Sequence, residues 1–278
     1  MVVIETVEEL KNALFRVHST GKSVGLVPTM GALHEGHLAL LKQARNENEV
    51  VVCSIFVNPV QFNNVSDLQK YPRTLEADIT LLAGFADIVF APSEKEVFPE
   101  PPTETYHFGT LETVMEGAFR QGHFNGVAVI VKRLFDWVNP QKAYFGEKDF
   151  QQLVIIKELV KQYDLPIEIV SCPIVREKSG LAKSSRNKLL NDSELEVAAN
   201  INRILQASLS LHTQSAKEIK SFVMNELAKE PALKPDYFEI VNAQTLQSIE
   251  NLKDSKEIVG CIAVYVGEVR LIDNIRYK

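Results

Sequence analysis

The chain has 278 residues, of which 45% are hydrophobic and 24% charged, and its formal net charge is -6. This length suits two domains, and the composition is ordinary for a globular protein with a full hydrophobic core. The negative charge argues against broad binding of nucleic acid, because no excess of cations is present to neutralise phosphates.

The cysteines and the lengths of the apolar runs indicate the cellular compartment that we expect for this protein. Cys53, Cys172 and Cys261 are far apart and show no zinc-ligand spacing, so we expect reduced thiols in a reducing compartment. The N-terminal stretch turns acidic at Glu5, which is unlike a signal peptide. The longest apolar run, Val50 to Val57, is too short to span a membrane. We therefore expect a cytoplasmic protein with neither membrane nor nucleic-acid partners.

Helices and buried strands alternate in the first part of the chain. Thr6 followed by Glu9 is a capping box and predicts the start of a helix. Strands are predicted at 24–27 (ended by Pro28), 50–57, 87–90, 143–145 and 167–170, and helices at 37–46, 74–82, 126–137 and 149–162. This alternation is typical of an α/β fold, a Rossmann-like doubly wound parallel sheet with helices on both faces.

The remaining segments divide the chain. Residues 92–105 contain four prolines and are predicted to be a surface loop. Residues 176–191 are polar, with Gly180 as a candidate hinge. Helices are predicted at 192–211 and 215–229, and strands at 237–241, 258–266 and 269–272, the last two joined as a hairpin. We therefore expect a Rossmann-like domain over 1–173 and a smaller C-terminal α+β domain over 174–278.

The segment from Pro28 to His37 lies where the first buried strand passes into its helix. Ligands of doubly wound sheets bind beyond the carboxyl ends of the strands, and a helix N-terminus there favours an anion. Gly31 and Gly36 allow the backbone to approach a phosphate closely, and the helix amides are predicted to face the same point. His34 and His37, three residues apart, can both point at one ligand.

Three other interpretations of this segment exist. It fails as a phosphate-binding P-loop, because His37 and Leu38 stand where Lys and Ser or Thr are required. It fails as a zinc-protease helix, whose histidines are four residues apart rather than three. A purely structural role, with glycines for a turn and histidines as helix caps, stays open when the segment is considered alone.

Several motifs in register resemble one known family. The His-x-Gly-His signature behind a strand resembles the nucleotidyltransferase superfamily that includes class I aminoacyl-tRNA synthetases, and more narrowly the pantothenate synthetase family. Further matching segments are Phe56 to Phe62, Tyr71 to Thr74, His123 to Val127, Phe145 to Gln152 and Ser184 to Asn187. Each motif alone is weak, but their common order from residue 28 to residue 187 makes the resemblance specific.

The resemblance implies an ATP-dependent ligase that joins pantoate to β-alanine through a pantoyl adenylate and releases AMP and pyrophosphate. It implies His37, His34 and Lys148 as catalytic residues. The ATP-binding residues that it implies are Met30, Gly31, Ala32, Leu33, His34, Glu35, Gly36, His37, Gly146, Glu147, Lys148, Asp149, Val175, Lys183, Ser184, Ser185 and Arg186. Without the resemblance, Lys148 and Asp149 would be taken for a solvated pair and a helix cap.

Other expectations also follow from the resemblance. Gln61 and Gln152 are implied to hold pantoate and β-alanine, with Asn58 as a further candidate. Mg²⁺ is expected to accompany ATP, and Asp78 is its candidate protein contact, although Asp78 also fits the polar face of its helix. The C-terminal domain is expected to act as a lid, and the protein to be a homodimer.

One position departs from the family pattern. Lys183 precedes Ser184 to Arg186, where the family commonly has methionine. Lys183 either adds a phosphate contact or extends its ammonium into solvent while its methylenes pack.

Two alternatives to this function are kept. One is another adenylate-forming nucleotidyltransferase of the superfamily, although a tRNA synthetase would need a basic tRNA-binding domain. The other is a non-catalytic nucleotide sensor on the same fold.

Overall fold

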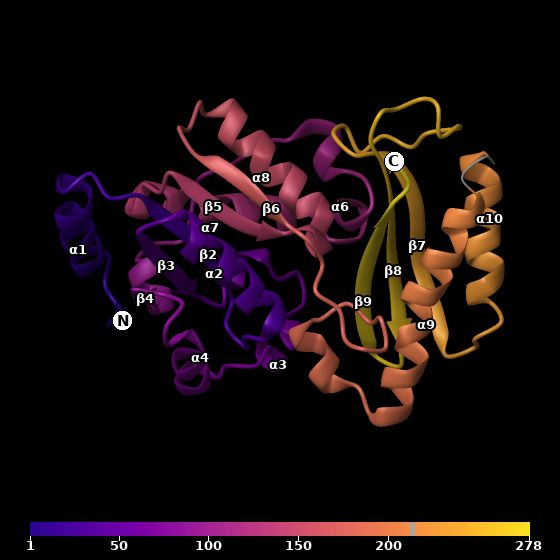
Figure 1. Cartoon of the computed structure of the whole chain (residues 1–278), viewed down its shortest axis with the longest axis horizontal. Coiled ribbons are helices and arrows are strands. Elements are labelled where there is room, and N and C mark those ends of the chain that lie inside the picture. Colours follow the sequence, from indigo (N-terminus) through magenta and orange to yellow (C-terminus); the bar gives the residue numbers. More distant parts are fainter. Residues whose placement is uncertain (212–214) are drawn as a thin grey trace. The chain divides into compact units, whose positions relative to one another are not determined.

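A computed structural model describes residues 1–211 and 215–278 (Figure 1). The described residues divide into two compact units. The sheet unit comprises 1–108, 120–147 and 155–173, and the C-terminal unit comprises 109–119, 148–154 and 174–278. The segments 109–119 and 148–154 thus group with the C-terminal unit, which the sequence did not indicate.

The sheet unit is built on six parallel strands in the order β1-β4-β3-β2-β5-β6. The strands are β1 (Val2–Ile4), β2 (Val24–Thr29), β3 (Val50–Ile55), β4 (Ile88–Phe90), β5 (Lys142–Gly146) and β6 (Glu168–Cys172). The strand order reverses between β2 and β5, so the crevice beyond their carboxyl ends is the favoured ligand position. The predicted Rossmann-like parallel sheet is confirmed.

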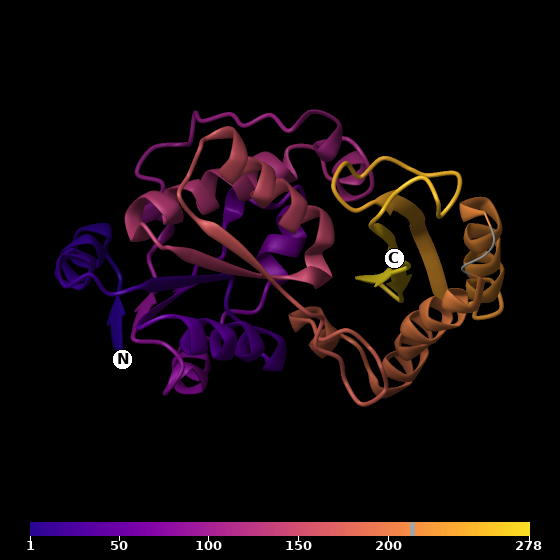
Figure 2. The same ribbon diagram turned by 45° about the horizontal axis from the view of Figure 1, so that its top comes forward.

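The helices of this fold are α1 (Val7–Ser19), α2 (Glu35–Glu47), α3 (Val65–Lys70), α4 (Leu75–Leu82), α5 (Glu94–Val97), α7 (His123–Val138) and α8 (Phe150–Gln162). Right-handed crossovers place α2 and α4 on one face of the sheet and α1, α7 and α8 on the other. Figure 2 shows α2 and α8 on opposite sides of the strands. The Thr6 hydroxyl accepts a hydrogen bond from the Glu9 amide, as its capping box predicts.

Several local predictions need correction. Strand β2 continues through Pro28 to Thr29. Its pairing with β5 covers only Gly25 and Leu26, so no strand pairs with Pro28 on that side, and the missing N–H of proline is tolerated there. Strand β3 ends at Ile55 and helix α2 begins at Glu35. The proline-rich segment is not all loop, because it contains α5.

Several short elements were not predicted, among them β1 and α3. With three and six residues, these two are too short to show a hydrophobic period.

The C-terminal unit is a three-stranded antiparallel sheet with two long helices and the short helices of 109–119. Its elements are η2 (Gly109–Glu112), α6 (Glu116–Phe119), η4 (Ser185–Leu189), α9 (Asp192–Ser208), η5 (Leu209–Leu211), α10 (Ala216–Leu227), β7 (Leu233–Asn242), β8 (Ile258–Val266) and β9 (Val269–Arg276). The β8–β9 hairpin turns at Gly267 with φ 55°, as predicted. A small α+β unit is therefore observed, and its lid role stays a prediction.

Strand β8 and part of β7 are buried on both faces. Phe238 and Ile262 belong to the core formed with α9 and α10. Val259 and Cys261 belong to a second core formed with Met115, Phe150 and Val154. The apolar contacts of this second face explain why 109–119 and 148–154 join this unit.

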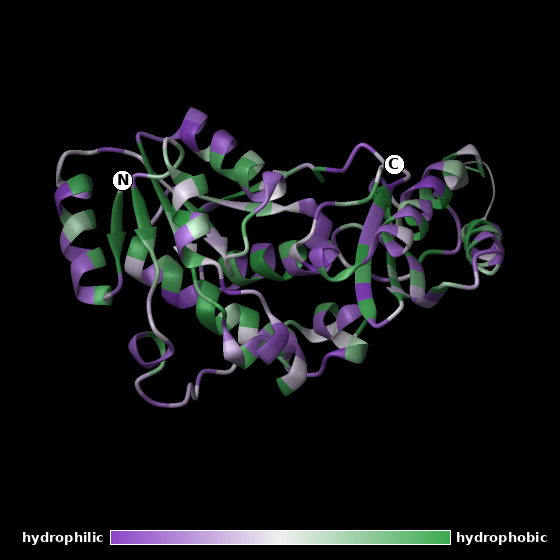
Figure 3. Cartoon of the chain, turned by 90° about the horizontal axis from the view of Figure 1, so that it is seen from below, coloured by the Kyte–Doolittle hydropathy of each residue, from purple (hydrophilic) through white to green (hydrophobic). Residues whose placement is uncertain are grey.

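Burial follows the hydropathy of the sequence. Figure 3 shows apolar residues along the short parallel strands near the N-terminus and alternating apolar and polar residues on the helices. Cys53, Cys172 and Cys261 are buried and not in disulfides, which confirms the predicted core thiols. Within 1–211 and 215–278, no helix combines the length and hydropathy needed to cross a membrane.

Candidate active site

The turn between β2 and α2, residues 30–34, has an unusual backbone. Gly31 has φ 78° and Ala32 has φ 50°, so two consecutive residues lie in the left-handed region. A Cβ on Gly31 would lie 3.0 Å from Asp78 Oδ2 and 3.1 Å from Ile55 Cγ2, so only glycine fits there without displacing a neighbour. For Ala32 this conformation costs about 1 kcal/mol, which the surrounding contacts must offset.

His34 and His37 cap the first turn of α2. The Gly36 amide donates to His34 Nδ1 over 3.1 Å, and the His34 amide donates to His37 Nδ1 over 3.3 Å. Both rings accept at Nδ1, so in their neutral forms the hydrogen of each ring is on Nε2. The ring centroids are 4.1 Å apart. The helix-cap interpretation is thus confirmed for the Nδ1 edges, while the Nε2–H edges have the chemistry of a phosphate donor.

The backbone amides of this turn are engaged within the protein. Ala32 and Leu33 donate to the two carboxylate oxygens of Asp78, at 2.9 and 2.8 Å. The Gly31 amide donates to the Thr29 hydroxyl, and the Gly36 amide to His34. Of the helix amides expected to face the ligand, that of Gly36 is instead bound to His34, whereas Gly31, Ala32 and Leu33 precede the helix. Recognition of an anion at this turn must rely more on side chains than in a P-loop.

Asp78 is buried on the inner side of α4, at 1% exposure. Its alternative placement on the polar face of that helix is wrong. Besides the two amides, Oδ2 accepts a hydrogen bond from the Thr74 hydroxyl over 3.2 Å. Magnesium prefers carboxylates that share their lone pairs with water and phosphate, and a buried carboxylate occupied by two amides does not fit this ligand role. Among the described residues, no group of three or more His, Cys, Asp or Glu side chains could hold a metal ion.

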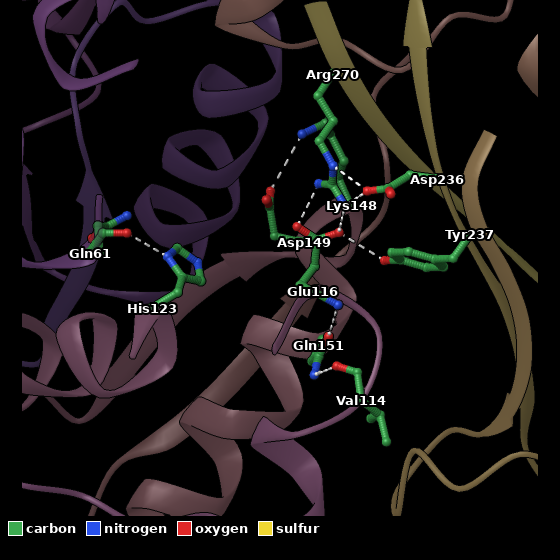
Figure 4. A network of polar contacts seen from close by, with 10 residues as sticks. All are labelled: Gln61, Val114, Glu116, His123, Lys148, Asp149, Gln151, Asp236, Tyr237 and Arg270. Carbon is green, nitrogen blue, oxygen red and sulfur yellow. Dashed lines mark hydrogen bonds and ion pairs between the residues drawn. The ribbon is translucent and has the colours of Figure 1, made fainter. Parts of the chain in front are cut away.

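Asn58 and Gln61 follow β3 and are buried at 1% and 8% exposure. The Asn58 amide donates to Gln61 Oε1 over 2.9 Å and to the Gly126 carbonyl over 3.0 Å. His123 Nδ1 lies 2.8 Å from the Gln61 carbonyl oxygen, to which it donates (Figure 4). A Cβ on Gly126 would lie 2.6 Å from the Val60 carbonyl oxygen. Asn58, His123 and Gly126 thus fix the position of Gln61.

The turn after β5 contains Lys148 and Asp149. Gly146 ends β5, and Glu147 to Asp149 form a single 3-10 turn before α8. Lys148 Nζ lies 3.6 Å from Asp149 Oδ2. The backbone carbonyl of Lys148 accepts a hydrogen bond from the side-chain amide of Asn274 over 3.1 Å. These two residues, Lys148 and Asp149, thus form the ion pair considered for them without the resemblance, with 20% of the Lys148 side chain and 49% of the Asp149 side chain exposed.

The two glutamines that begin α8 differ in burial. Gln151 is 4% exposed; its amide donates to the carbonyls of Leu111 and Val114, and its Oε1 accepts from the Glu116 amide. Gln152 is half-buried. The structure thus assigns Gln151 to the framework and leaves Gln152 as the candidate for binding.

Residues 175–183 form a tight hairpin. Arg176 pairs with Ala182, the Val175 carbonyl accepts from the Lys183 amide over 2.9 Å, and Gly180 turns with φ 92°. Arg176 is bound to both carboxylate oxygens of Asp273 at 2.7 and 2.9 Å. Gly180 therefore serves the turn, where a Cβ would lie 2.6 Å from the Asn202 amide.

Lys183 forms an ion pair with Glu177 at 2.9 Å, and its side chain is 15% exposed. It is therefore not extended into solvent, and its phosphate contact stays a prediction. Ser184 caps the following 3-10 turn by accepting from the Arg186 amide, and Ser185 is buried.

A charged cluster in the C-terminal unit was not predicted. Arg270 contacts both oxygens of Glu116 at 2.8 Å and Asp236 at 2.9 Å, and the Tyr237 hydroxyl donates to Glu116 over 2.9 Å (Figure 4). Burial, and then the Glu116 carboxylate, raises the pKa of Tyr237. These contacts join 109–119 to the C-terminal strands, and no local pattern could have signalled them.

Comparison with known proteins agrees with this arrangement. The family model described as pantoate-beta-alanine ligase matches residues 2–276. This chain belongs to that family. A pantothenate synthetase from Bacteroides fragilis is 54% identical over 280 residues, which cover 100% of this chain and 99% of the relative.

Solved structures support the same assignment. The pantothenate synthetase of Thermus thermophilus has 42% identity and a TM-score of 0.94, with 100% of this chain and 99% of that one covered. The pantoate-beta-alanine ligase of Francisella tularensis, described as complexed with beta-gamma ATP and beta-alanine, has 35% identity and a TM-score of 0.83 over 100% of this chain and 98% of that one.

Proposed function

We propose that this member of the pantoate–β-alanine ligase family makes pantothenate in two steps, of which the first consumes ATP. A carboxylate oxygen of pantoate attacks the α-phosphorus, the bond to the bridging oxygen breaks, and pyrophosphate leaves. The amine of β-alanine then attacks the adenylated carbonyl, AMP leaves, and the amine loses a proton. The observation that carries the proposal is the family match over residues 2–276 together with the ordered His34–His37 turn.

His34 and His37 are proposed to donate Nε2–H hydrogen bonds to the phosphates. Negative charge develops on the departing pyrophosphate, and preorganised donors that already have their final orientation stabilise it most. The caps at Nδ1 support this role, because they fix both the ring orientation and the position of the hydrogen. Lys148 and Arg186 are proposed as the charged phosphate contacts, with Ser184 and Ser185 as further ATP-binding residues.

Gln61 and Gln152 are proposed to hold pantoate and β-alanine. An amide both donates and accepts, which suits a substrate with hydroxyl and carboxylate groups. The Asn58 amide supports the role of Gln61, because its bond to Oε1 orients the Gln61 amide nitrogen. We propose Asn58 as a residue that positions Gln61 and not as a second pantoate contact.

ATP is proposed to enter as its Mg²⁺ complex, with phosphate oxygens and water as metal ligands. A homodimer and a cytoplasmic location are proposed from the family resemblance, and the three reduced thiols are compatible with that location. Light scattering of the purified chain measures the first of these two properties.

The test is product formation from defined substrates. The purified chain is expected to release AMP and pyrophosphate continuously only when ATP, pantoate and β-alanine are all present. No turnover with pantoate, or turnover with an amino acid and tRNA, would reject the proposed function in favour of another nucleotidyltransferase. A nucleotide sensor would bind ATP without releasing either product.

A further inference from the structure

Asp78 is a buried carboxylate whose partners all belong to the sheet unit. Its two oxygens accept from the Ala32 amide at 2.9 Å and the Leu33 amide at 2.8 Å, and the Thr74 hydroxyl adds a third bond. Asp78 lies 46 residues after Ala32 in the chain, so the bonds fasten α4 to the turn that precedes α2. Charge-assisted hydrogen bonds of this kind are about twice as strong as neutral ones.

The turn needs such a fastening. Gly31 and Ala32 both have positive φ, and Ala32 adopts this conformation against its own preference. The two residues that donate to Asp78 directly precede His34, the N-cap of α2. A change in the direction of these amides therefore moves the backbone from which the His34 ring is suspended, and His37 follows because its Nδ1 is bound to the His34 amide.

We propose that Asp78 is a positioning residue that holds His34 and His37 for phosphate, acting through the amides of Ala32 and Leu33 and not through magnesium. This proposal rests on the proposed function of the two histidines. It also gives those amides a partner other than the nucleotide, so the turn binds ATP with side-chain donors.

The proposal makes a specific prediction for Asp78→Asn. An asparagine keeps one acceptor oxygen but turns an NH₂ group toward the other amide, so one of the two bonds is replaced by a contact between donors. We expect kcat to fall about 100-fold, because a displacement of about 1 Å at a reacting centre costs that much. The Mg²⁺ concentration that gives half-maximal rate should stay unchanged.

Glu76→Gln is the matched control, since Glu76 is an exposed carboxylate on the same helix. It removes the same charge from α4 without touching the turn and should leave kcat unchanged. Hydrogen exchange of the Ala32 and Leu33 amides is the second measurement and needs no activity. Exchange should accelerate in Asp78→Asn and not in Glu76→Gln.

Thr74→Val serves if Asp78→Asn does not fold. Thr74 makes no side-chain cap bond to its helix, so valine there removes only the hydroxyl bond to Asp78. A smaller change in the same direction is expected, with faster exchange of both amides and a reduced kcat. Unchanged exchange and kcat in Thr74→Val would then overturn the proposal.

Other outcomes separate the alternatives. Restoration of Asp78→Asn activity by a high Mg²⁺ concentration would overturn the proposal and make Asp78 a metal ligand. A folded Asp78→Asn with normal exchange and normal kcat would overturn it as well. If the unmodified chain itself makes no pantothenate, the proposed function fails, and amide exchange alone still decides whether Asp78 fastens the turn.

Discussion

Three carboxylates among residues 1–211 and 215–278 are buried, Asp78 in the sheet unit at 1% exposure, and Asp273 and Glu116 in the C-terminal unit at 5% and 8%. Asp78 and Glu116 make the most instructive comparison. Asp78 is surrounded by neutral donors, two backbone amides and a hydroxyl. Glu116 is paired with the Arg270 guanidinium and the Tyr237 hydroxyl. Both satisfy the rule that a buried charge must be hydrogen-bonded.

The difference lies in what each carboxylate holds. Asp78 fixes the conformation of one turn, the turn that presents two candidate phosphate donors. Glu116 joins segments that are far apart in the sequence, because Arg270 follows it by 154 residues. The contacts of Asp78 orient a candidate site, and the contacts of Glu116 hold the C-terminal unit together. Substitutions near Asp78 should therefore affect rate more than stability, and those near Glu116 should do the reverse.

The largest expected effect is on the rate, from a pair of substitutions at His34. Asparagine is a good N-cap and replaces Nδ1 as the acceptor, but it has no donor near the position of Nε2. We expect His34→Asn to lower the rate of pyrophosphate release about 100-fold, equivalent to about 3 kcal/mol, at nearly normal stability. His34→Gln should lose about 1 kcal/mol of stability with a smaller loss of rate.

Single-turnover pyrophosphate release and urea unfolding measure these two quantities. Equal losses of rate in His34→Asn and His34→Gln would contradict a division of roles between the two ring nitrogens.

The second effect is on stability, from Arg270→Met. Methionine fills a similar volume but leaves Glu116 and Asp236 facing each other without a cation. Removing one partner of a buried ion pair leaves uncompensated charge, and we expect a loss of about 3 kcal/mol in the free energy of unfolding. Arg203→Met is the control, because Arg203 is exposed on α9 and should change stability by about 0.5 kcal/mol or less. Similar urea midpoints for both variants would show that the cluster is dispensable.

The smallest expected effect is on the pH dependence of stability, from a substitution at Glu47, a carboxylate that remains accessible to water. Glu47 pairs with Lys142 at 2.9 Å, and each side chain is 30% exposed. The hydrogen bond from Lys142 holds the pKa of Glu47 below its usual range. A lowered folded-state pKa adds stability that is present above the unfolded-state pKa and is lost as pH falls through the folded-state value.

Glu47→Gln should therefore lose less stability than the unmodified chain when the pH falls from neutral into the acid range below about 4. The difference should be less than about 1 kcal/mol, because water screens the pair. Urea unfolding at several pH values measures it. Parallel pH profiles would show that this pair, unlike the contacts of Asp78 and Glu116, contributes nothing to stability.

The sequence predicted most of the sheet unit correctly, and the reason is physical. Strands such as Val50–Ile55 are buried along their whole length, so their sequences are nearly continuous apolar runs. Helices α1, α2 and α4 carry apolar stripes and, in α1, a capping box, which are local signals. The His34–His37 signature is also local, so the position of the candidate site could be predicted without a structure.

The roles of single side chains were less predictable. Gln151 and Gln152 are neighbours of the same type, and only the contact of Gln151 with Leu111 and Val114 distinguishes framework from candidate site. Asp78 was expected to contact magnesium or face solvent. One signal was available, because Asp78 precedes Leu82 by four residues and so shares its helix face, and an acid on a buried face needs a specific partner.

The sequence by itself determined the parallel α/β architecture, the small C-terminal α+β region and the family, because each of these follows from periodicity or from motifs contiguous along the chain. Only the tertiary structure decided which ring nitrogen of His34 is used for the helix cap, which partners Asp78 and Glu116 take, and that 109–119 packs with the C-terminal strands. These facts depend on atoms brought together from distant positions in the chain, and burial there makes each unsatisfied polar group costly enough to select a single partner.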